Sequence, residues 1–343
     1  PIIWSILITS LSTSTIITMA SHHWMLAWLG LELNTLSILP VIMKTPHPRA
    51  TEATMKYFLI QALAAAMILF TSTMNAWQTG LWEITHTTHI TTTIITMAIL
   101  LKLGVAPVHL WYPEVLQGTT LNMALLISTW QKLAPLSLLY MMHNNLPNNL
   151  LLLTGLLSAL LGGLAGLNQT QTRKIMAHSS IAHMGWILIA LNMTPKLTTL
   201  ALSTYMIMTT AMFSSLSTST MKTITDMGTT WSSSPTMTAL TLLTLTSLGG
   251  LPPLTGFMPK LLILNELTTK PLLPMATTLA LTSLPSLFFY IRMAHTTTLT
   301  APPNTTNIEY KWRFNATPLP THTATTALAL LLMPLSPVLY MTT

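Results

Sequence analysis

Apolar runs of about twenty residues recur along the whole of this chain of 343 residues, and they constrain its fold more than any other feature. A helix of about 20 residues is long enough to cross the hydrocarbon core of a bilayer. Only 6% of the residues are Asp, Glu, Lys or Arg, whereas a soluble domain usually carries about 25%. The sequence therefore predicts an all-α polytopic membrane protein rather than a soluble domain with one anchor.

The apolar runs predict about eleven transmembrane helices, of which the fourth and the ninth are broken. The first run has no charged region before it and no clear cleavage site, so we expect a retained helix rather than a signal peptide. The eleven segments are Ile2–Ala20, Trp24–Met43, Met55–Trp77, Ile90–Trp111, Leu121–Met142, Leu150–Leu167, Ile175–Leu191, Leu197–Ser217, Met237–Leu264, Leu272–Met293 and Thr323–Tyr340.

Each broken helix combines a lysine with helix-breaking residues inside an apolar run. In Ile94–Gly118, Lys102 precedes a break at Gly104–Pro107, and in Leu245–Leu264, a Gly-Gly and a Pro-Pro pair precede Lys260. Proline removes a backbone donor and frees a carbonyl group, which a bilayer tolerates only where the break faces protein or water. A polar pathway through a membrane requires both features, a buried charge and backbone groups freed from helical hydrogen bonds.

The spacing of the two broken helices predicts an inverted repeat. They are five spans apart, and because five is odd they cross the membrane in opposite directions. We expect one integral membrane domain over residues 1–343, with five-helix repeats at 1–145 and 146–295, followed by a loop and a last helix at 296–343. Interrupted helices at matching positions of inverted halves point to a transport path.

The loops differ in their content of Lys and Arg, which predicts the orientation of the chain. Positively charged loops face the cytoplasm or the matrix, so the N-terminus is expected on that side and the C-terminus on the other. The loops after even-numbered helices contain Lys44, Arg49, Arg173, Lys174, Lys222, Lys311 and Arg313, and those after odd-numbered helices contain mainly Lys196 and Lys270.

Four ionisable residues lie inside predicted spans, namely Glu32, Lys102, Lys132 and Lys260. A lysine at the centre of a bilayer costs about 2.5–3.5 kcal/mol on insertion scales. Burial disfavours the charged form of either residue type, so both can exchange protons near neutral pH. The four residues are the predicted proton carriers. Glu32 is alternatively a structural ion-pair partner, and the depth of Lys260 is not set by its spacing from the break.

Other basic groups give weaker signals. Lys44, Lys56, Lys174 and Arg292 lie near helix ends, where long side chains extend toward the interface. Among the histidines, His109 follows the first break and is a candidate proton relay. His178 and His183 are five residues apart on one predicted helix and so do not share a face closely, which favours a core role. We predict no metal site at His22–His23 or at the pair His86 and His89.

Several classes of function are excluded by what the sequence lacks. The chain has no cysteine, which excludes disulfides, cysteine-ligated iron–sulfur clusters and thiol catalysis. No paired zinc histidine motif, nucleotide loop or haem signature occurs, so we predict no cofactor on this chain. The net charge of +7 is not arranged as a basic stripe with aromatic residues, so we predict no nucleic-acid partner.

Six stretches in chain order resemble a known family, the antiporter-like membrane-arm subunits of respiratory complex I, the proton-pumping NADH:ubiquinone oxidoreductase. Together they extend over most of the chain. The stretches are HWMLAWLGLELN (23–34), RATEATMKYFL (49–59), LLKLGVAPVHLWYPEVLQG (100–118), TWQKLAP (129–135), GLNQTQTRKIMAHSSIAHMGW (166–186) and SLGGLPPLTGFMPK (247–260).

The resemblance implies two inverted five-helix bundles with a central hydrophilic axis. It implies that Glu32 and Lys102 form a gate, and that Lys132 and Lys260 carry protons along the axis. NADH, FMN, iron–sulfur clusters and ubiquinone are then bound by other subunits. The implied partners are the other membrane-arm subunits, including a neighbouring antiporter-like subunit, and membrane lipids. The implied location is the mitochondrial inner membrane, with the N-terminus in the matrix and the C-terminus in the intermembrane space.

Two other functions remain open from the sequence. The first is a subunit of a multi-subunit cation/proton antiporter, because local motifs such as Leu100–Gly118 are shared in character with that family. The second is a structural spacer, whose buried charges hold helices in register rather than move protons.

Overall fold

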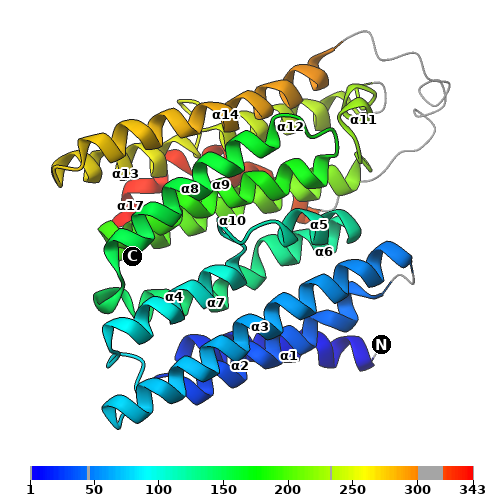
Figure 1. Ribbon diagram of the computed structural model, residues 1–343. Helices are drawn as coiled ribbons and strands as arrows, with labels where there is room; N and C mark the ends of the chain where they lie inside the picture. Colours follow the sequence, from blue (N-terminus) through cyan, green and yellow to red (C-terminus); the bar gives the residue numbers. More distant parts are fainter. Residues whose placement is uncertain (1, 45–46, 232–233, 300–319, 343) are drawn as a thin grey trace. The chain divides into compact units, whose positions relative to one another are not determined.

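The computed structural model describes residues 2–44, 47–231, 234–299 and 320–342 (Figure 1). These residues form helices, and the only β-type pairings among them are two isolated bridges. Lys311 and Arg313, which entered the predicted orientation, lie outside the described residues. The chain divides into two compact units, Pro1–Leu157 and Ser158–Thr343, and α8 (Asn148–Gly166) crosses the division.

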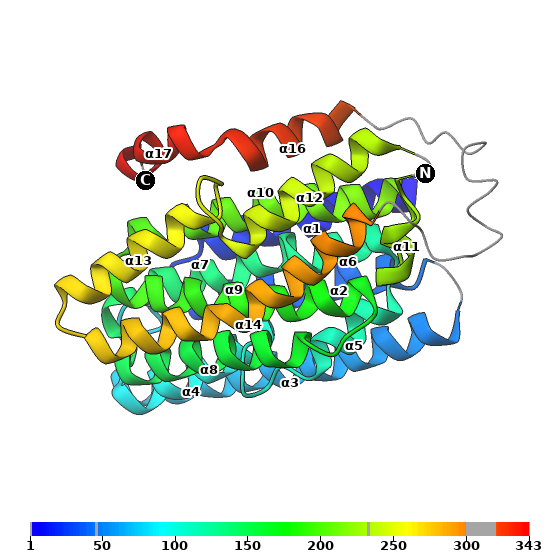
Figure 2. The same cartoon turned by 90° about the horizontal axis from the view of Figure 1, so that it is seen from above.

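The first unit contains the first five predicted spans, and α1–α3 are continuous helices that pack side by side (Figure 2). The third helix begins seven residues before its predicted start, because Pro48 occupies its first turn and the ring of His47 caps the Arg49 amide. The helices are α1 (Ile2–Ala20), α2 (Trp24–Ile42), α3 (Pro48–Thr79), α4 (His89–Leu103), α5 (Trp111–Gly118), α6 (Leu121–Ser128), a 3₁₀ turn (Trp130–Lys132), α7 (Leu133–Met141) and a second 3₁₀ turn (His143–Asn145).

The second unit contains the remaining helices, among which α10 packs against α9, α12 and α16 (Figure 2). A short helix, α11, was not predicted from the apolar pattern. The helices are α9 (Thr172–Met193), α10 (Pro195–Thr218), α11 (Ile224–Gly228), α12 (Pro235–Gly249), α13 (Phe257–Thr269), α14 (Leu273–Thr298), α16 (Pro320–Leu331), a 3₁₀ turn (Met333–Leu335) and α17 (Ser336–Thr342).

Seven helices among the described residues are long and apolar enough to cross a membrane by themselves. An eighth crossing is formed if the helix pair His322–Leu331 and Met333–Met341, which is bent by 62°, counts as one span. The remaining predicted spans are the interrupted pairs α4–α5, α6–α7 and α12–α13. One interruption was not predicted, because Leu121–Met142 is divided by the 3₁₀ turn at Trp130–Lys132.

Both predicted breaks are present, and they have the same local structure. Helices α4 and α12 are each followed directly by a glycine, Gly104 and Gly250, which have φ angles of +68° and +80°. The next amide donates to the carbonyl five positions back, at 3.1 Å after Gly104 and 3.3 Å after Gly250. This is the Schellman end of a helix, whose left-handed residue is usually glycine because a Cβ disfavours that conformation. The Ala106–Pro107 and Pro252–Pro253 bonds that follow are cis.

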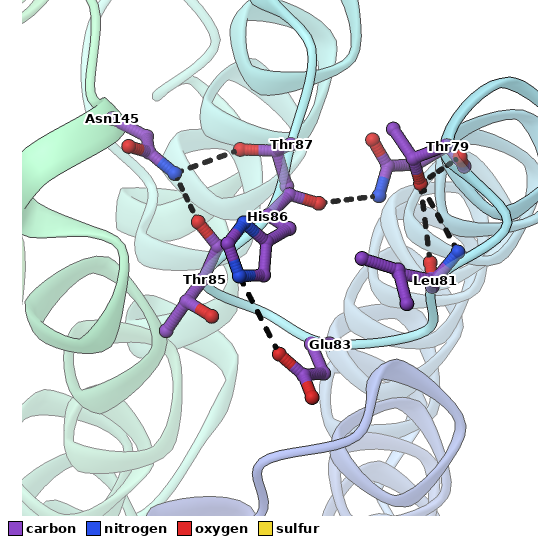
Figure 3. A network of polar contacts seen from close by, with 8 residues as sticks. Thr79, Leu81, Glu83, Thr85, His86, Thr87 and Asn145 are labelled. Atoms are coloured by element: carbon purple, nitrogen blue, oxygen red, sulfur yellow. Dashed lines mark hydrogen bonds and ion pairs between the residues drawn. The ribbon is translucent and has the colours of Figure 1, made fainter.

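Within the first unit, the loops that follow α1, α3 and α7 lie at one end. Figure 3 shows Asn145 donating to the Thr85 carbonyl and, at 3.3 Å, to Thr87 Oγ1. An isolated bridge joins His23 to Glu83. In the second unit, the loops after α8 and α10 are joined by the bridge between Gln171 and Thr223. Alternate loops therefore meet at the same end within each unit, as successive antiparallel crossings require.

Charged side chains at helix ends make specific contacts. Lys56 pairs with Glu52 and with Glu114 at 2.6 Å each, and the second pair joins α3 to α5. Arg292 on α14 donates to the carbonyls of Leu167 and Gln169 after α8.

Candidate functional site

Lys102 lies in the last turn of α4, one turn before the chain breaks. Its side chain is only 6% exposed, and its ammonium has no hydrogen-bond or ion-pair partner among the described residues. The free carbonyls at the C-terminal end of a helix carry partial negative charge and attract a cation. The break therefore provides electrostatic compensation for a buried lysine that has no direct partner.

Lys132 lies in the 3₁₀ turn between α6 and α7 and is 3% exposed. Its ammonium is 5.1 Å from the centroid of the Tyr112 ring, which is a cation–π distance. The turn forms because Pro135 has no N–H and cannot continue the α-helical ladder to the carbonyl of Gln131. The Lys132 amide instead donates to the Thr129 carbonyl three positions back, at 3.2 Å.

Lys102 and Lys132 line one cavity inside the first unit. Uncharged polar groups make up much of its wall, and none of the described residues that line it is a carboxylate. Hydroxyl and amide groups of this kind can hold water against a buried charge. The polar lining residues, besides the lysines, are Asn34, Thr35, Tyr57, Gln61, Tyr112 and Gln131.

Glu32 lies beside this cavity rather than in its wall. Its Oε2 accepts a hydrogen bond of 3.2 Å from the hydroxyl of Thr35, which does line the cavity. Glu32 interacts electrostatically with Lys102, but the two form no ion pair within 4.0 Å. The structure therefore places three of the four predicted carriers, Glu32, Lys102 and Lys132, around one polar space.

Lys260 lies in the second unit, on α13 and beyond the second break. Its ammonium donates to the Gly249 carbonyl at 2.9 Å and lies 5.9 Å from the Trp186 ring. Gly249 is the last residue of α12, so this carbonyl is one that the break frees. Lys102 precedes its break and Lys260 follows its own. Even so, Lys102 lies in the last turn of α4 and the Lys260 ammonium binds the last carbonyl of α12, so each lysine is associated with the C-terminal end of the first half of a broken helix.

His109 is buried in the connector between α4 and α5, and its Nδ1 lies 3.2 Å from the Pro107 carbonyl oxygen. It does not line the cavity that holds Lys102 and Lys132. The structure thus places this candidate relay near the first break but away from the other carriers.

Two family models match the chain over nearly its whole length. The model described as "NADH:quinone oxidoreductase/Mrp antiporter, TM" matches residues 21–285, and the one described as "NADH dehydrogenase subunit 2 C-terminus" matches residues 287–340. A relative from Salmo salar, named NADH-ubiquinone oxidoreductase chain 2, is 54% identical over 98% of this chain and 97% of its own. A relative of the same name from Xenopus laevis is 51% identical over 92% of each chain.

The chain belongs to the NADH-ubiquinone oxidoreductase chain 2 family. The resemblance inferred from the six stretches, to subunit 2 within the antiporter-like subunits, is confirmed. Two solved structures share the fold. A chain of respiratory complex I from Thermus thermophilus has a TM-score of 0.86 at 24% identity and covers 99% of this chain and 80% of its own. A chain of the Mrp complex from Dietzia sp. DQ12-45-1b has a TM-score of 0.82 at 15% identity, covering 97% and 75%.

The structure places one histidine, His183, beside a predicted proton carrier, which the sequence analysis of this chain 2 family member did not expect. His183 lines a second cavity with Lys260, and its Nε2 lies 3.4 Å from the Tyr290 hydroxyl. The sequence favoured a core role for this histidine. Its position three residues before Trp186, on the same helical face, was the available signal. His178 does not line this cavity.

No group of three or more His, Cys, Asp or Glu side chains arranged to hold a metal ion occurs in the part of the chain that the structure describes.

The contact between Gly250 and Lys260 predicts the effect of a small substitution. A Cβ at Gly250 would lie 2.8 Å from the Lys260 Nζ, and alanine would also be strained at a φ of +80°. We expect Gly250→Ala to displace the ammonium from the Gly249 carbonyl and to lower proton translocation several-fold, measured in vesicles containing the complex. Gly249→Ala is the matched control, because its Cβ meets nothing closer than 3.8 Å and the carbonyl is kept. Equal translocation by the two variants would contradict the prediction.

Proposed function

We propose that this chain is a core membrane-arm subunit of the proton-pumping NADH:ubiquinone oxidoreductase of the mitochondrial inner membrane. The observation that carries the proposal is identity of more than half, over nearly the full length of both chains, to relatives named as chain 2 of that enzyme. The chain then acts as a subunit of an H⁺-translocating oxidoreductase. In this proposal NADH, FMN, iron–sulfur clusters and ubiquinone bind to other subunits. For the clusters, the support is that this chain has no cysteine to hold one.

The chemistry of this chain is proton movement driven from outside it. Electron transfer in the other subunits releases the free energy, and moving one charge against 100 mV costs about 2.3 kcal/mol. A buried ammonium without a direct partner changes its proton affinity when a carboxylate approaches or withdraws. Glu32 lies beside the cavity and forms no ion pair with Lys102, so it is suited to be the carboxylate that approaches and withdraws. The two residues form the gate of the proposed path.

The proposed path continues from the gate to Lys132 across the first cavity and then to Lys260. Support for Lys132 comes from its burial in the wall of the same cavity as Lys102. Support for Lys260 comes from its bond to a carbonyl freed by the second break. His109 and His183 are further relay candidates, of which only His183 lines a cavity with a lysine.

The proposed arrangement has eleven crossings, in which α4–α5, α6–α7, α12–α13 and α16–α17 each form one interrupted span. Two five-helix repeats at 1–145 and 146–295 then have opposite orientations. The N-terminus lies in the matrix and the C-terminus in the intermembrane space. Partners are the other membrane-arm subunits, a neighbouring antiporter-like subunit among them, and membrane lipids, which suit exposed apolar side chains such as Ile6 and Ile16.

Purification tests the proposed assembly against the second candidate function, a subunit of a multi-subunit cation/proton antiporter. The fold alone does not separate them, because the Mrp chain shares it. The complex containing this chain is solubilised mildly, isolated and assayed for NADH:ubiquinone reduction. We expect redox subunits to be isolated together with this chain. We also expect inhibitors of the rotenone type, which act at the quinone site, to block the isolated activity. Isolation with cation-transport subunits and no NADH oxidation would support the antiporter instead.

Substitution of Lys132 separates proton transport from a spacer role. Methionine is close to lysine in length and apolar, so Lys132→Met should keep the packing and allow assembly. We expect proton pumping linked to quinone reduction to fall about tenfold, while NADH oxidation by artificial acceptors is unchanged. Lys222→Met, at an exposed position, is the control. A Lys132→Met complex that pumps at the native rate would leave only the structural role for this lysine.

A further inference from the structure

An amide side chain joins three elements of the first unit. Gln131 Nε2 donates to Asn34 Oδ1 on α2 at 3.0 Å, and the Tyr57 hydroxyl on α3 donates to Gln131 Oε1 at 3.4 Å. Gln131 itself lies in the 3₁₀ turn, 97 residues from Asn34 and 74 from Tyr57 in sequence. Asn34 and Tyr57 are buried, and all three residues line the cavity that holds the two lysines.

The hydrogen bond between Gln131 and Asn34 is called the bridge from here on. Its two residues lie close in sequence to proposed proton carriers. Asn34 follows Glu32 by two residues on α2, and Gln131 immediately precedes Lys132 in the turn. The bridge therefore connects the backbone that carries the gate carboxylate to the backbone that carries the next lysine. On the Lys102 side of the cavity, Gln61 Nε2 donates to the Lys102 carbonyl at 3.3 Å.

The turn that carries Lys132 depends on side-chain contacts for its position. Pro135 supplies no N–H to the Gln131 carbonyl, so the main-chain ladder is interrupted at this residue. A 3₁₀ turn has poorer hydrogen-bond geometry than an α-helix and often marks a place where a helix can adjust. An amide that contacts two neighbouring helices supplies an anchor that the main chain lacks here.

We infer that Gln131 is a positioning residue, which transmits a displacement of α2 at Glu32 to the ammonium of Lys132. The inference rests on the proposed proton-translocating function. The amide groups of Gln131 and Asn34 do not titrate, so the bridge sets distances and orients cavity water without taking up the transferred proton. Glu32 and Lys132 are then coupled mechanically as well as by charge.

The test uses a substitution that keeps the amide and changes only its reach. Gln131→Asn shortens the side chain by one methylene, so it no longer spans the gap to Asn34. We expect protons pumped per NADH to fall about threefold or more, because small misplacements of a reacting group are costly. The pH profile of quinone-linked turnover is expected to shift, while the content of assembled complex and oxidation by artificial acceptors stay native. Gln78→Asn makes the same change at an exposed amide at the end of α3 and is the control.

An exchange of the two amides tests the bridge itself. The double variant Asn34→Gln with Gln131→Asn restores the combined length of the pair, and we expect it to recover most of the pumping that Gln131→Asn loses. Native pumping with a native pH profile in Gln131→Asn, or no recovery in the double variant, would overturn the inference. If Gln131→Asn does not assemble, Asn34→Leu decides, because it removes the acceptor on α2: reduced pumping supports the bridge, and native pumping overturns it.

The proposed function and this inference fail in different ways. Native pumping by Lys132→Met would contradict the proposed proton path, and the inference about Gln131 would fail with it. If Lys132→Met loses pumping and Gln131→Asn pumps at the native rate, the proposed path is supported and only the positioning role of Gln131 is contradicted.

Discussion

Replacing Lys102 by methionine is expected to abolish most proton pumping by the complex while the complex still assembles. The ammonium is buried and without a partner among the described residues, so an apolar side chain of similar length removes a desolvated charge rather than a stabilising contact. We expect pumping linked to quinone reduction to fall tenfold or more, equal to at least about 1.4 kcal/mol in the barrier. The measurement is the pH change inside lipid vesicles that contain the purified complex.

Two controls make this result specific. NADH oxidation by artificial acceptors should stay native, because it uses redox centres on other subunits. Lys196→Met removes a lysine at an exposed helix start and should pump normally. Normal pumping by Lys102→Met would show that the orphaned ammonium is not on the proton path. Loss of the assembled complex would instead make Lys102 a structural residue.

The second large effect is expected from Gly256, where the second broken helix folds against itself. A Cβ built on Gly256 would lie 1.8 Å from the Ser247 carbonyl oxygen, and the overlap is with backbone. Overpacking typically costs about 1–3 kcal/mol where side chains can shift, and a rigid carbonyl shifts less. We therefore expect Gly256→Ala to reduce the amount of assembled complex severely, as measured by native electrophoresis and by thermal unfolding.

The comparison variant for Gly256 lies in the same break. At Gly249 the nearest atom to an added Cβ is 3.8 Å away, on Tyr290, which is an ordinary contact. Gly249→Ala should therefore assemble nearly as well as the native chain. Equal assembly of the two variants would mean that the connector between α12 and α13 is looser than its geometry indicates.

The sequence predicts most of the helical organisation because its signals are local. A run of about twenty apolar residues is enough to predict a crossing, and a glycine followed by prolines is enough to predict where a helix ends. Gly104 and Gly250 are found at the ends of α4 and α12, as the pattern predicted. The burial of Lys102 and Lys132 was predicted in the same way, from their positions inside predicted membrane spans.

The interruption at Lys132 was missed although its cause is in the sequence. Pro135 lies inside an otherwise continuous apolar run, and a proline there either kinks a helix or is absorbed by a local 3₁₀ turn. Which outcome occurs depends on what can anchor the turn. Here the anchor is the Gln131 side chain, whose partners lie on α2 and α3.

What the sequence determined by itself is therefore the membrane-crossing pattern, the two glycine-ended breaks and the rare charges beside them. Only the tertiary structure decided which polar groups share a space: Lys102 with Lys132 and the Gln131–Asn34 bridge, and Lys260 with His183. It also decided that Lys260 binds the carbonyl freed at Gly249, so that two lysines on opposite sides of their breaks occupy equivalent helix ends. The reason is physical. Hydropathy and helix-breaking act within a few residues along the chain, whereas cavities and hydrogen-bond bridges join helices that only packing brings together.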